Sequence, residues 1–360
     1  MPDFTSALYL GMLHAHEALC PWQQMTTGRP AVLEPSTRAD RLADRLALMV
    51  GCESAVLATS TLHIFWDLFD ILASESVAIH LDAGSYPIVR WGVERVAAKG
   101  VRSTTFKKHD PVALQANLHR APDVTRRPVV VTDGVCPLTG RTAPLREYMR
   151  IVRKFGGLLI IDDTQGFGIF GHDPTDALPY GGDGAGTPAW CGVAGQELIV
   201  VSSLAKAFGA PVAVIAGSRH WIDKFKAASL TRLHCSPPSM AAISAAENAL
   251  AINAAEGFAR RNRLLELVRI FKRGMRGIGV ITQGGLFPVQ TLTRPAGSDA
   301  VVLYTQLLQD GVRTVLRRAS NGGRAAVTFI LNCLHTNFEI DRALRALGQF
   351  RLQNFRTAAV

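Results

Sequence analysis

One lysine of this chain stands where a reactive amine is expected. The stretch VVSSLAKAFGAPVAVIAGS places Lys206 among small residues, between a buried strand and a second apolar run. Removing water from around a lysine lowers its pKa, and the neutral amine is then a nucleophile that can form a Schiff base with a carbonyl cofactor. A loop lysine that extends its ammonium group into water gives the same pattern. Lys206 alone leaves both interpretations open.

A carboxylate at the end of an apolar strand is the second chemical signal. The stretch LLIIDDTQGFGIFGHD ends its apolar run at Asp162 and Asp163 and then turns through glycines. A pyridoxal cofactor needs a carboxylate at its ring nitrogen, which keeps the pyridinium protonated, and a lysine for its Schiff base. Asp162 and Lys206 meet both needs if they stand at different strand ends of one sheet. An Asp-Asp pair after a strand is equally compatible with a magnesium site.

The elements that must position these groups alternate along the chain. Segments rich in Val, Ile and Leu are separated by amphipathic stretches, which predicts an α/β fold with a parallel sheet covered by helices on both faces. Such sheets bind ligands beyond the carboxyl ends of their strands, where Asp162 and the Lys206 stretch fall. The predicted strands are Ser54–Ala58, Val77–Leu81, Pro128–Thr132, Leu158–Ile161, Leu198–Ser202 and Pro211–Ala216. The predicted helices are Arg38–Val50, Ile64–Ala73, Ile88–Ala98, Pro111–His119 and Leu145–Phe155.

The pattern changes after the stretch HCSPPS, which predicts a second, smaller domain. We predict an N-terminal arm or part of the small domain at 1–37, a large cofactor-binding domain at 38–240 and a small α+β domain at 241–360. The Gly-rich stretch Tyr180–Gly195 is predicted to be a surface loop. The elements predicted for the small domain are helices Met240–Arg276, Asp299–Gln309 and Phe338–Leu347 and strands Val280–Thr282, Pro288–Leu292 and Ala325–Leu331.

Composition excludes several other classes of protein. With 360 residues, 48% hydrophobic and 19% charged, the chain is expected to be globular. It has no apolar run of about 18 residues and no signal-peptide pattern at its N-terminus, so we expect a cytoplasmic protein without a membrane contact. Six cysteines without a C-x-x-C pair argue against a zinc site or a disulfide framework. The net charge of +10 is scattered, which favours an anionic cofactor or substrate over nucleic acid.

Two long stretches resemble a known family. VVTDGVCPLTGRTAPLREYMRIVRKFGGLLIIDDTQGFGIFG is similar to the motif T-[DE]-G-V-F-S-M-D-G-x-x-A-P-L … L-x-x-D-[DE]-A-H-G-x-G-x-x-G, and the Lys206 stretch is similar to T-x-G-K-A-x-G. Both motifs are those of the α-oxoamine synthases, which are fold-type I pyridoxal-phosphate enzymes and include 8-amino-7-oxononanoate synthase and 2-amino-3-ketobutyrate CoA ligase. The likeness runs from about Tyr9 to the C-terminus. It implies a mostly parallel seven-stranded sheet of the aspartate aminotransferase type with a smaller C-terminal domain.

The resemblance also implies roles for individual residues around pyridoxal 5'-phosphate. Lys206 would form the Schiff base, Asp162 would pair with the pyridine nitrogen, and Tyr86 would stack on the ring where the family has a histidine. The family's site is shared between two protomers, so a homodimer is implied. The remaining cofactor-binding positions are Ser60, Thr61 and Leu62 at a phosphate-binding turn, Ser203 at a phosphate hydroxyl, Ser236 toward the neighbouring subunit's phosphate, Asp133, and Gln165 at the phenolic oxygen.

The departures from the family pattern are concentrated at the chemistry. Gln165 replaces a histidine and cannot titrate, and Thr61 replaces a glycine. Pro137 replaces a serine and supplies no donor. The arginine that clamps the substrate carboxylate has no direct counterpart, because Ala326 and Thr328 stand where arginines belong. The candidates for this clamp are Arg324 and Arg318, with Arg317 as a further alternative.

The sequence therefore favours a pyridoxal-phosphate-dependent transferase on a non-standard substrate. The leading hypothesis joins an amino-acid Cα carbanion to an acyl thioester of CoA or of a carrier protein. A second hypothesis keeps the cofactor but performs transamination, β/γ-substitution or an aldol-type cleavage. A third is a catalytically silent partner subunit, although Lys206 and Asp162 are both retained.

Overall fold

The protein is described from a computed structural model of the whole chain. It describes residues 1–33, 36–120, 125–296, 298–317 and 324–355. The chain forms two compact units. The large unit consists of residues 12–136 and 142–257, and the small unit of residues 1–11, 137–141 and 258–360. The domain boundaries expected at 37/38 and 240/241 stay a prediction.

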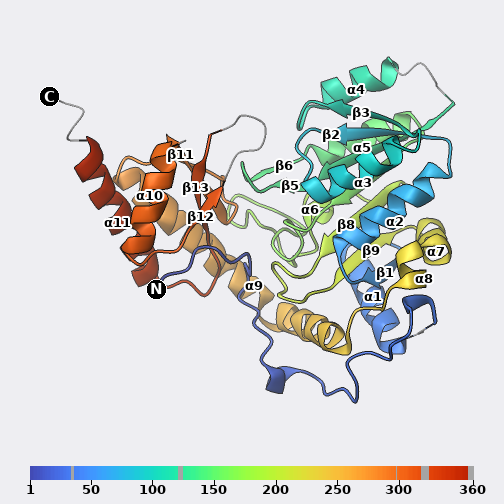
Figure 1. Cartoon of the computed structure of the whole chain (residues 1–360), viewed down its shortest axis with the longest axis horizontal. Coiled ribbons are helices and arrows are strands. Elements are labelled where there is room, and N and C mark those ends of the chain that lie inside the picture. Colours follow the sequence, from blue (N-terminus) through green and yellow to red (C-terminus); the bar gives the residue numbers. More distant parts are fainter. Residues whose placement is uncertain (34–35, 121–124, 297, 318–323, 356–360) are drawn as a thin grey trace. The chain divides into compact units, whose positions relative to one another are not determined.

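The core of the large unit is a seven-stranded sheet with the strand order β1-β9-β8-β7-β4-β2-β3 (Figure 1). Its neighbouring strands are parallel except that β9 runs antiparallel to both β1 and β8. The predicted mostly parallel seven-stranded fold is thus confirmed, with β9 as the one antiparallel strand of this sheet. The strands are β1 Ser54–Ala58, β2 Val77–Asp82, β3 Arg102–Phe106, β4 Arg127–Asp133, β7 Leu158–Asp162, β8 Leu198–Ser203 and β9 Ala213–Gly217.

The reversed direction of β9 follows from its connection to β8. A parallel neighbour needs a crossover of a dozen or more residues, and the turn 204–212 is too short for one. β8 and β9 therefore pair as an antiparallel hairpin, with Ser203 opposite Ala213. This arrangement closes a turn around Lys206, so the strand reversal has a direct effect on the candidate site.

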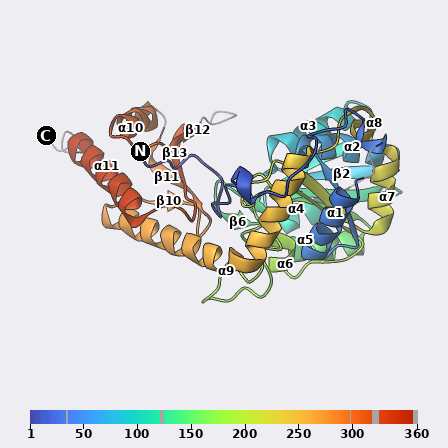
Figure 2. The same cartoon turned by 90° about the horizontal axis from the view of Figure 1, so that it is seen from below.

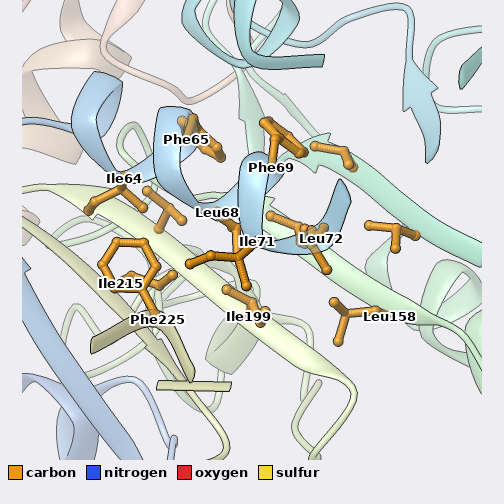
Figure 3. Packing of buried hydrophobic residues seen from close by; sticks show 14 of the residues in the cluster. Ile64, Phe65, Leu68, Phe69, Ile71, Leu72, Leu158, Ile199, Ile215 and Phe225 are labelled. Carbon is orange, nitrogen blue, oxygen red and sulfur yellow. The ribbon is translucent and has the colours of Figure 1, made fainter. Parts of the chain in front are cut away.

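Helices cover one face of the sheet with aliphatic and aromatic side chains. These helices are α2 Thr61–Ala73, α3 Pro87–Ala97 and α7 Arg219–Ala228. Figure 3 shows how Leu68 and Ile71 of α2 lie over Ile199 of β8 and Ile215 of β9. Because these side chains are almost fully buried, replacing one such as Leu68 with alanine should cost about 2–5 kcal/mol of stability.

A second apolar cluster covers the opposite face. It contains residues of α4 Pro111–His119 and α5 Leu145–Lys154, packed against β4, β7 and β8. Helix α4 begins where its sequence predicts, because Pro111 occupies the first turn and the Asp110 carboxylate accepts a hydrogen bond from Ala113 N at 2.9 Å. Because helices cover both faces of the sheet, the side chains on both sides of each central strand are buried. This explains why these strands are continuously apolar.

The other elements of the large unit surround the sheet or connect its parts. Helix α9 is a single long helix whose residues belong to both units (Figure 2). The elements are η1 His16–Ala18, η2 Ala31–Leu33, α1 Thr37–Met49, α6 Thr187–Trp190, α8 Leu230–His234, α9 Met240–Gly277 and the two-residue strands β5 Val135–Cys136 and β6 Arg141–Thr142.

The small unit contains a four-stranded antiparallel sheet with the order β10-β11-β13-β12. Its core joins the N-terminal segment to the C-terminal part of the chain: the rings of Phe4 and His335 stack at 4.4 Å, and Phe4 also contacts Phe329. None of the helices described here is long and apolar enough to cross a membrane. The elements are β10 Thr282–Gln283, β11 Val289–Ala296, α10 Ser298–Gln309, β12 Val315–Arg317, β13 Ala326–Ile330 and α11 Asn337–Phe355.

Three local predictions need correction. Strand β3 was not predicted, because its sequence RSTTF is polar and largely exposed, as suits the edge of a sheet. Helix α2 begins at Thr61 rather than Ile64, because Ser60 caps it. The stretch Tyr180–Gly195 is not a surface loop, since Tyr180, Ala185 and Thr187 are almost completely buried.

Candidate active site

Three aspartates stand at the carboxyl ends of neighbouring strands. Asp82 ends β2, Asp133 ends β4 and Asp162 ends β7, and each is at most 7% exposed. Asp133 and Asp162 are direct partners in the parallel pairing of β4 and β7. The strand order places β4 between β2 and β7. Parallel strands therefore gather three carboxyl groups along one edge of the sheet, the edge where such sheets bind ligands.

Asp162 and Lys206 influence each other electrostatically across the ends of β7 and β8. Burial raises the pKa of Asp162, while a hydrogen bond from Thr164 N at 3.1 Å and the charge of Lys206 lower it. Burial likewise lowers the pKa of Lys206, and the charge of Asp162 raises it. Each group is thus desolvated by burial and stabilised in its charged form by the other. The structure brings the predicted acid and the predicted amine together.

The turn that carries Lys206 is held by the β8–β9 hairpin. Leu204 N donates to Val212 O at 2.8 Å, next to the pairing of Ser203 with Ala213. Thr164, after β7, joins this turn to the acid: its hydroxyl accepts a hydrogen bond from Ser203 N at 3.0 Å, and its own N–H donates to Asp162. The intervening Thr164 thus links the Asp162 carboxylate to the turn that carries Lys206.

Asp163 has a different role from its neighbour. Its carboxylate accepts hydrogen bonds from both Thr187 N, at 2.8 Å, and the Thr187 hydroxyl, and it is completely buried. Added Cβ atoms at Gly134, Gly166 and Gly186 would lie 2.1–2.4 Å from its oxygens, so the glycines make room for it. Burial raises the pKa of Asp163 to about 7. The second aspartate anchors the loop that carries α6, and the pair is not a two-carboxylate metal site.

Asp133 lies beside Asp162 and holds the start of α3. Its carboxylate accepts a hydrogen bond from Tyr86 N at 3.1 Å. Burial, together with the neighbouring charge of Asp162, raises the pKa of Asp133 well above its ordinary value. Tyr86 is the N-cap residue of α3, and its side chain is 50% exposed. A half-exposed ring attached to a fixed backbone is available to stack on a ligand.

The N-terminus of α2 carries three of the predicted phosphate-binding positions. Ser60 caps the helix, Thr61 is buried and Leu62 is 42% exposed. Ser60 Oγ lies 2.8 Å from His63 Nδ1, and Thr59 Oγ1 lies 3.0 Å from the same nitrogen. A helix N-terminus presents backbone N–H groups and a positive dipole end, which suit a phosphate. His63 adds a titratable group that sequence reasoning did not single out.

The remaining predicted residues have less defined surroundings. Gln165 is half-buried near the end of β7, and Ser236 is exposed. Arg324 is exposed and belongs to the small unit, and Arg318 lies outside the described residues. Thr328, at a position where the family has arginine, is buried in β13, and its hydroxyl lies 2.9 Å from that of Thr291. The identity of the carboxylate clamp stays a prediction.

Sequence reasoning missed two residues that organise this edge. Asp82 accepts hydrogen bonds from four groups, and a signal for it existed, because VAIHLD ends in aspartate in the same way as the strands before Asp133 and Asp162. Thr164 gave no local signal, since its contact is with Ser203, in another part of the sequence. Only the folded arrangement shows its role.

The side chains at this edge fit pyridoxal phosphate. A buried carboxylate and a desolvated amine at neighbouring strand ends supply the two chemical partners that the cofactor ring requires, and the α2 N-terminus supplies an anion site. With the mostly parallel seven-stranded sheet, they define a pyridoxal-phosphate-dependent enzyme of fold type I.

Comparison with protein families also identifies a pyridoxal-phosphate-dependent enzyme. The family model for aminotransferase class I and II matches residues 29–347. This chain belongs to the aminotransferase class I and II family and is a pyridoxal-phosphate-dependent transferase.

Two curated relatives are 8-amino-7-oxononanoate synthases. The chain is 29% identical over 315 residues to that of Halorhodospira halophila (strain DSM 244 / SL1), covering 86% of this chain and 74% of the relative. It is 27% identical over 328 residues to that of Pseudomonas aeruginosa PAO1, covering 90% and 71%.

Solved structures share the fold. Serine palmitoyltransferase from S. paucimobilis superposes with a TM-score of 0.84 at 18% identity, covering 97% of this chain and 86% of that chain. The 8-amino-7-oxononanoate synthase of Francisella tularensis has a TM-score of 0.74 at 17% identity, covering 99% of both chains.

Proposed function

We propose that this enzyme joins the Cα of an amino acid to the acyl group of a thioester and releases the free thiol. The placement of Asp162 at the end of β7 and of Lys206 after β8, where each acts on the charge of the other, carries the proposal, and the two curated relatives named 8-amino-7-oxononanoate synthase support the reaction class. The basic net charge of the chain suits an anionic thioester such as acyl-CoA or an acyl carrier protein. The amino acid and the acyl group are not specified by these features.

Lys206 and Asp162 have different chemical roles in this proposal. When bound, pyridoxal phosphate withdraws electrons from the substrate Cα, so that a proton there becomes removable. Lys206 Nζ would bond the cofactor carbonyl, and the same amine would hold and move the proton of the substrate Cα. Its lowered pKa increases the fraction of neutral amine available for both tasks. The Asp162 carboxylate would keep a proton on the ring nitrogen.

Other residues of the large unit hold the cofactor in this proposal. The Tyr86 ring would stack on the cofactor ring, and Gln165 would hydrogen-bond its phenolic oxygen. Asp133 fixes the Tyr86 backbone through its 3.1 Å hydrogen bond. The α2 N-terminus would hold the phosphate, with Ser203 as a further donor.

Two further elements complete the proposed site. Ser236 of one protomer reaches the phosphate of the other, so the active form is a homodimer. Exposure of Ser236 leaves its hydroxyl accessible to a second chain. Arg324 binds the substrate carboxylate.

A second candidate reaction is transamination or another amino-acid conversion that needs no thioester. The observation that favours it is the surroundings of Thr328, whose buried hydroxyl pairs with Thr291 where the family pattern has an arginine. Gln165, which cannot titrate, points the same way. A changed set of polar groups is expected where the second substrate or the reaction differs.

Reduction with borohydride tests the attachment of the cofactor. We expect one cofactor to become covalently fixed on the peptide that contains Lys206, identified by mass spectrometry. Lys206→Ala should abolish this label and the visible absorbance of the bound cofactor, whereas Lys107→Ala, at an exposed position, should leave both unchanged. Absence of the label from the wild-type protein saturated with cofactor would favour the silent-subunit hypothesis.

Thiol release tests the reaction. A panel of amino acids is incubated with acyl-CoA or acyl carrier protein, while a thiol reagent reports turnover and mass spectrometry identifies the product. The proposal requires a product that contains both carbon skeletons. The amino-acid carboxylate must either remain in this product or be released as carbon dioxide in an amount equal to that of the product. Amino-acid conversion at the same rate without any thioester would reject it in favour of the second candidate.

A further inference from the structure

A second cavity lies in the large unit, apart from the candidate cofactor residues. It has a volume of about 350 Å³ and is enclosed by α1, β1, the ends of α7 and α8, the start of α9 and the segment around Met25. This volume falls within the range of small-molecule sites. None of its lining residues is among the predicted cofactor-binding positions. It is therefore a separate feature with its own chemistry.

One part of the cavity is apolar. Its wall is formed by Ala43 of α1, Val56 and Leu57 of β1 and Ile243 of α9, each at most 7% exposed. The segment that carries Met25 is held in place, because Met240 N donates to Met25 O at 3.0 Å. The wall is thus made of fixed elements of the fold. An aliphatic group bound here would exchange water for close hydrocarbon contact.

The other part of the cavity contains Arg232. The Nε atom of Arg232 is buried and has no hydrogen-bond partner within the described ranges. The nearest carboxylates that act on its charge are Asp40 and Asp67. Asp67 already accepts hydrogen bonds from Ser229 and Thr231. An N–H of a guanidinium group removed from water without an acceptor costs free energy that a bound anion would recover.

Two cations line the cavity. Lys226, half-buried at the end of α7, lies there together with Arg232, and Asp40 is the one carboxylate among the described residues of the lining. Burial lowers the pKa of Arg232. Asp67, the second carboxylate that acts on Arg232, lies outside the lining and already accepts hydrogen bonds from Ser229 and Thr231, so it leaves the Arg232 Nε open to a bound anion. An apolar wall and a cationic end together define the kind of ligand that would fit.

We propose that this cavity binds a small amphiphilic monoanion, whose carboxylate or phosphate group contacts Arg232 and Lys226 and whose aliphatic body lies against Val56, Leu57 and Ile243. Guanidinium groups bind both anions through charge-assisted hydrogen bonds, and these are stronger than neutral ones. A neutral hydrocarbon would leave Arg232 Nε without an acceptor. A highly charged nucleotide would place polar groups against the apolar wall. The ligand therefore has one anionic group and an apolar body.

Calorimetric titration of the holoenzyme tests this proposal without any turnover. The probes are octanoate, octyl phosphate and 1-octanol, which share a chain and differ in the head group. We expect saturable binding of at least one anion at one molecule per chain, and binding at least 10-fold weaker for 1-octanol. The two anion arms distinguish a carboxylate site from a phosphate site. Binding of 1-octanol as tight as that of the anions, or no saturable heat for any probe, would overturn the proposal.

Two variants and a control test whether the binding heat measured by calorimetry comes from this cavity. Arg232→Met keeps the length of the side chain but removes its charge, and it should weaken anion binding about 10- to 100-fold, the size of a lost charge-assisted hydrogen bond. Arg45→Met removes an exposed charge from the same helix as Ala43 and should leave binding unchanged. Ala39→Leu fills the cavity from α1 and should abolish binding even if Arg232→Met fails to fold. Unchanged affinity in Ala39→Leu or in folded Arg232→Met would contradict the assignment.

Discussion

The ends of β2 and β7 present the same residue in two different environments. Asp82 at the end of β2 accepts hydrogen bonds from Gly84 N, His109 N, the Thr132 hydroxyl and the Tyr148 hydroxyl. These groups come from two turns, a neighbouring strand and α5. A carboxylate satisfied by so many donors has no capacity left for a ligand. Asp82 therefore joins elements of the fold to one another.

Asp162 is also buried but much less satisfied. Within the described residues its carboxylate accepts hydrogen bonds from a single residue, Thr164, and feels the charge of Lys206. A buried carboxylate with remaining acceptor capacity is costly to the fold unless a ligand completes its environment. The comparison teaches that the number of donors, rather than burial or position at a strand end, separates a structural aspartate from a candidate functional one.

The largest expected effect is on turnover. Asp162→Asn keeps the size of the side chain but removes the charge that would hold the ring proton, so kcat should fall about 10²- to 10³-fold. The thermal midpoint should stay close to that of the wild type, because the substitution affects contacts with Thr164 alone among the described hydrogen-bond partners. Steady-state kinetics with saturating cofactor, beside a thermal melt, measures both. Wild-type turnover in this variant would remove Asp162 from the chemistry.

The next largest effect is on the pH dependence of stability, and it distinguishes the structural role of Asp163 from the proposed catalytic role of Asp162. The pKa of Asp163 is about 7 in the folded protein and 3.8 for an ordinary aspartate, so the folded state retains the proton longer. Its contribution to stability is then full below pH 3.8 and is lost as pH rises through 7, by at most about 4 kcal/mol.

Chemical denaturation of the wild type and Asp163→Asn between pH 4 and 7 measures this loss. The variant cannot titrate, so its unfolding free energy should fall less over the same range. Because the Thr187 hydroxyl can donate or accept, one of the two hydrogen bonds survives in the variant. Identical pH dependence of both proteins would show that Asp163 does not titrate in this window.

Asp82→Asn should give the opposite result to Asp162→Asn. In the variant, the amide nitrogen would face N–H or O–H donors that a carboxylate oxygen accepts in the wild type. This mismatch should lower the free energy of unfolding by about 2–3 kcal/mol. Turnover per folded molecule should change less than threefold. Denaturant titration and kinetics on the same preparation test both expectations. A loss of kcat as large as that of Asp162→Asn, without loss of stability, would contradict the contrast between the two strand ends.

The smallest expected effect concerns the link between Asp162 and Lys206. Thr164→Val removes the hydroxyl that accepts from Ser203 N, a hydrogen bond worth about 1 kcal/mol. The Lys206 turn should become less well fixed, which lowers kcat a few-fold and shifts the pH profile of cofactor absorbance. Thr164→Ser, which keeps the hydroxyl, should restore both. Thr305→Val on α10 serves as a control, since its hydroxyl contacts only its own helix.

Much of the fold was predictable from local patterns. Strand β1 and helix α4 have the predicted bounds, because an apolar run and an Asp-Pro helix start are complete signals within a few residues. Strand β3 was missed because an edge strand carries no apolar pattern. The burial of Thr187 was missed because its partner, Asp163, is distant in sequence.

The same distinction applies to the site. Asp162 and Lys206 were predicted because one ends an apolar strand and the other closely follows one, each in a distinctive stretch. The function of Thr164, the saturation of Asp82 and the unpaired Nε of Arg232 depend on groups from other strands and helices. No local pattern encodes such contacts.

The sequence by itself determined most strands and helices of the large unit and the class of chemistry, and it predicted the acid and the amine. Hydrophobic periodicity and short motifs act over a few residues and can be read without coordinates. The tertiary structure decided which aspartate is already satisfied, which way β9 runs and where an arginine Nε has no acceptor among the described residues. Those outcomes depend on hydrogen-bond donors and charges brought together from distant positions, and only the folded chain sets their distances.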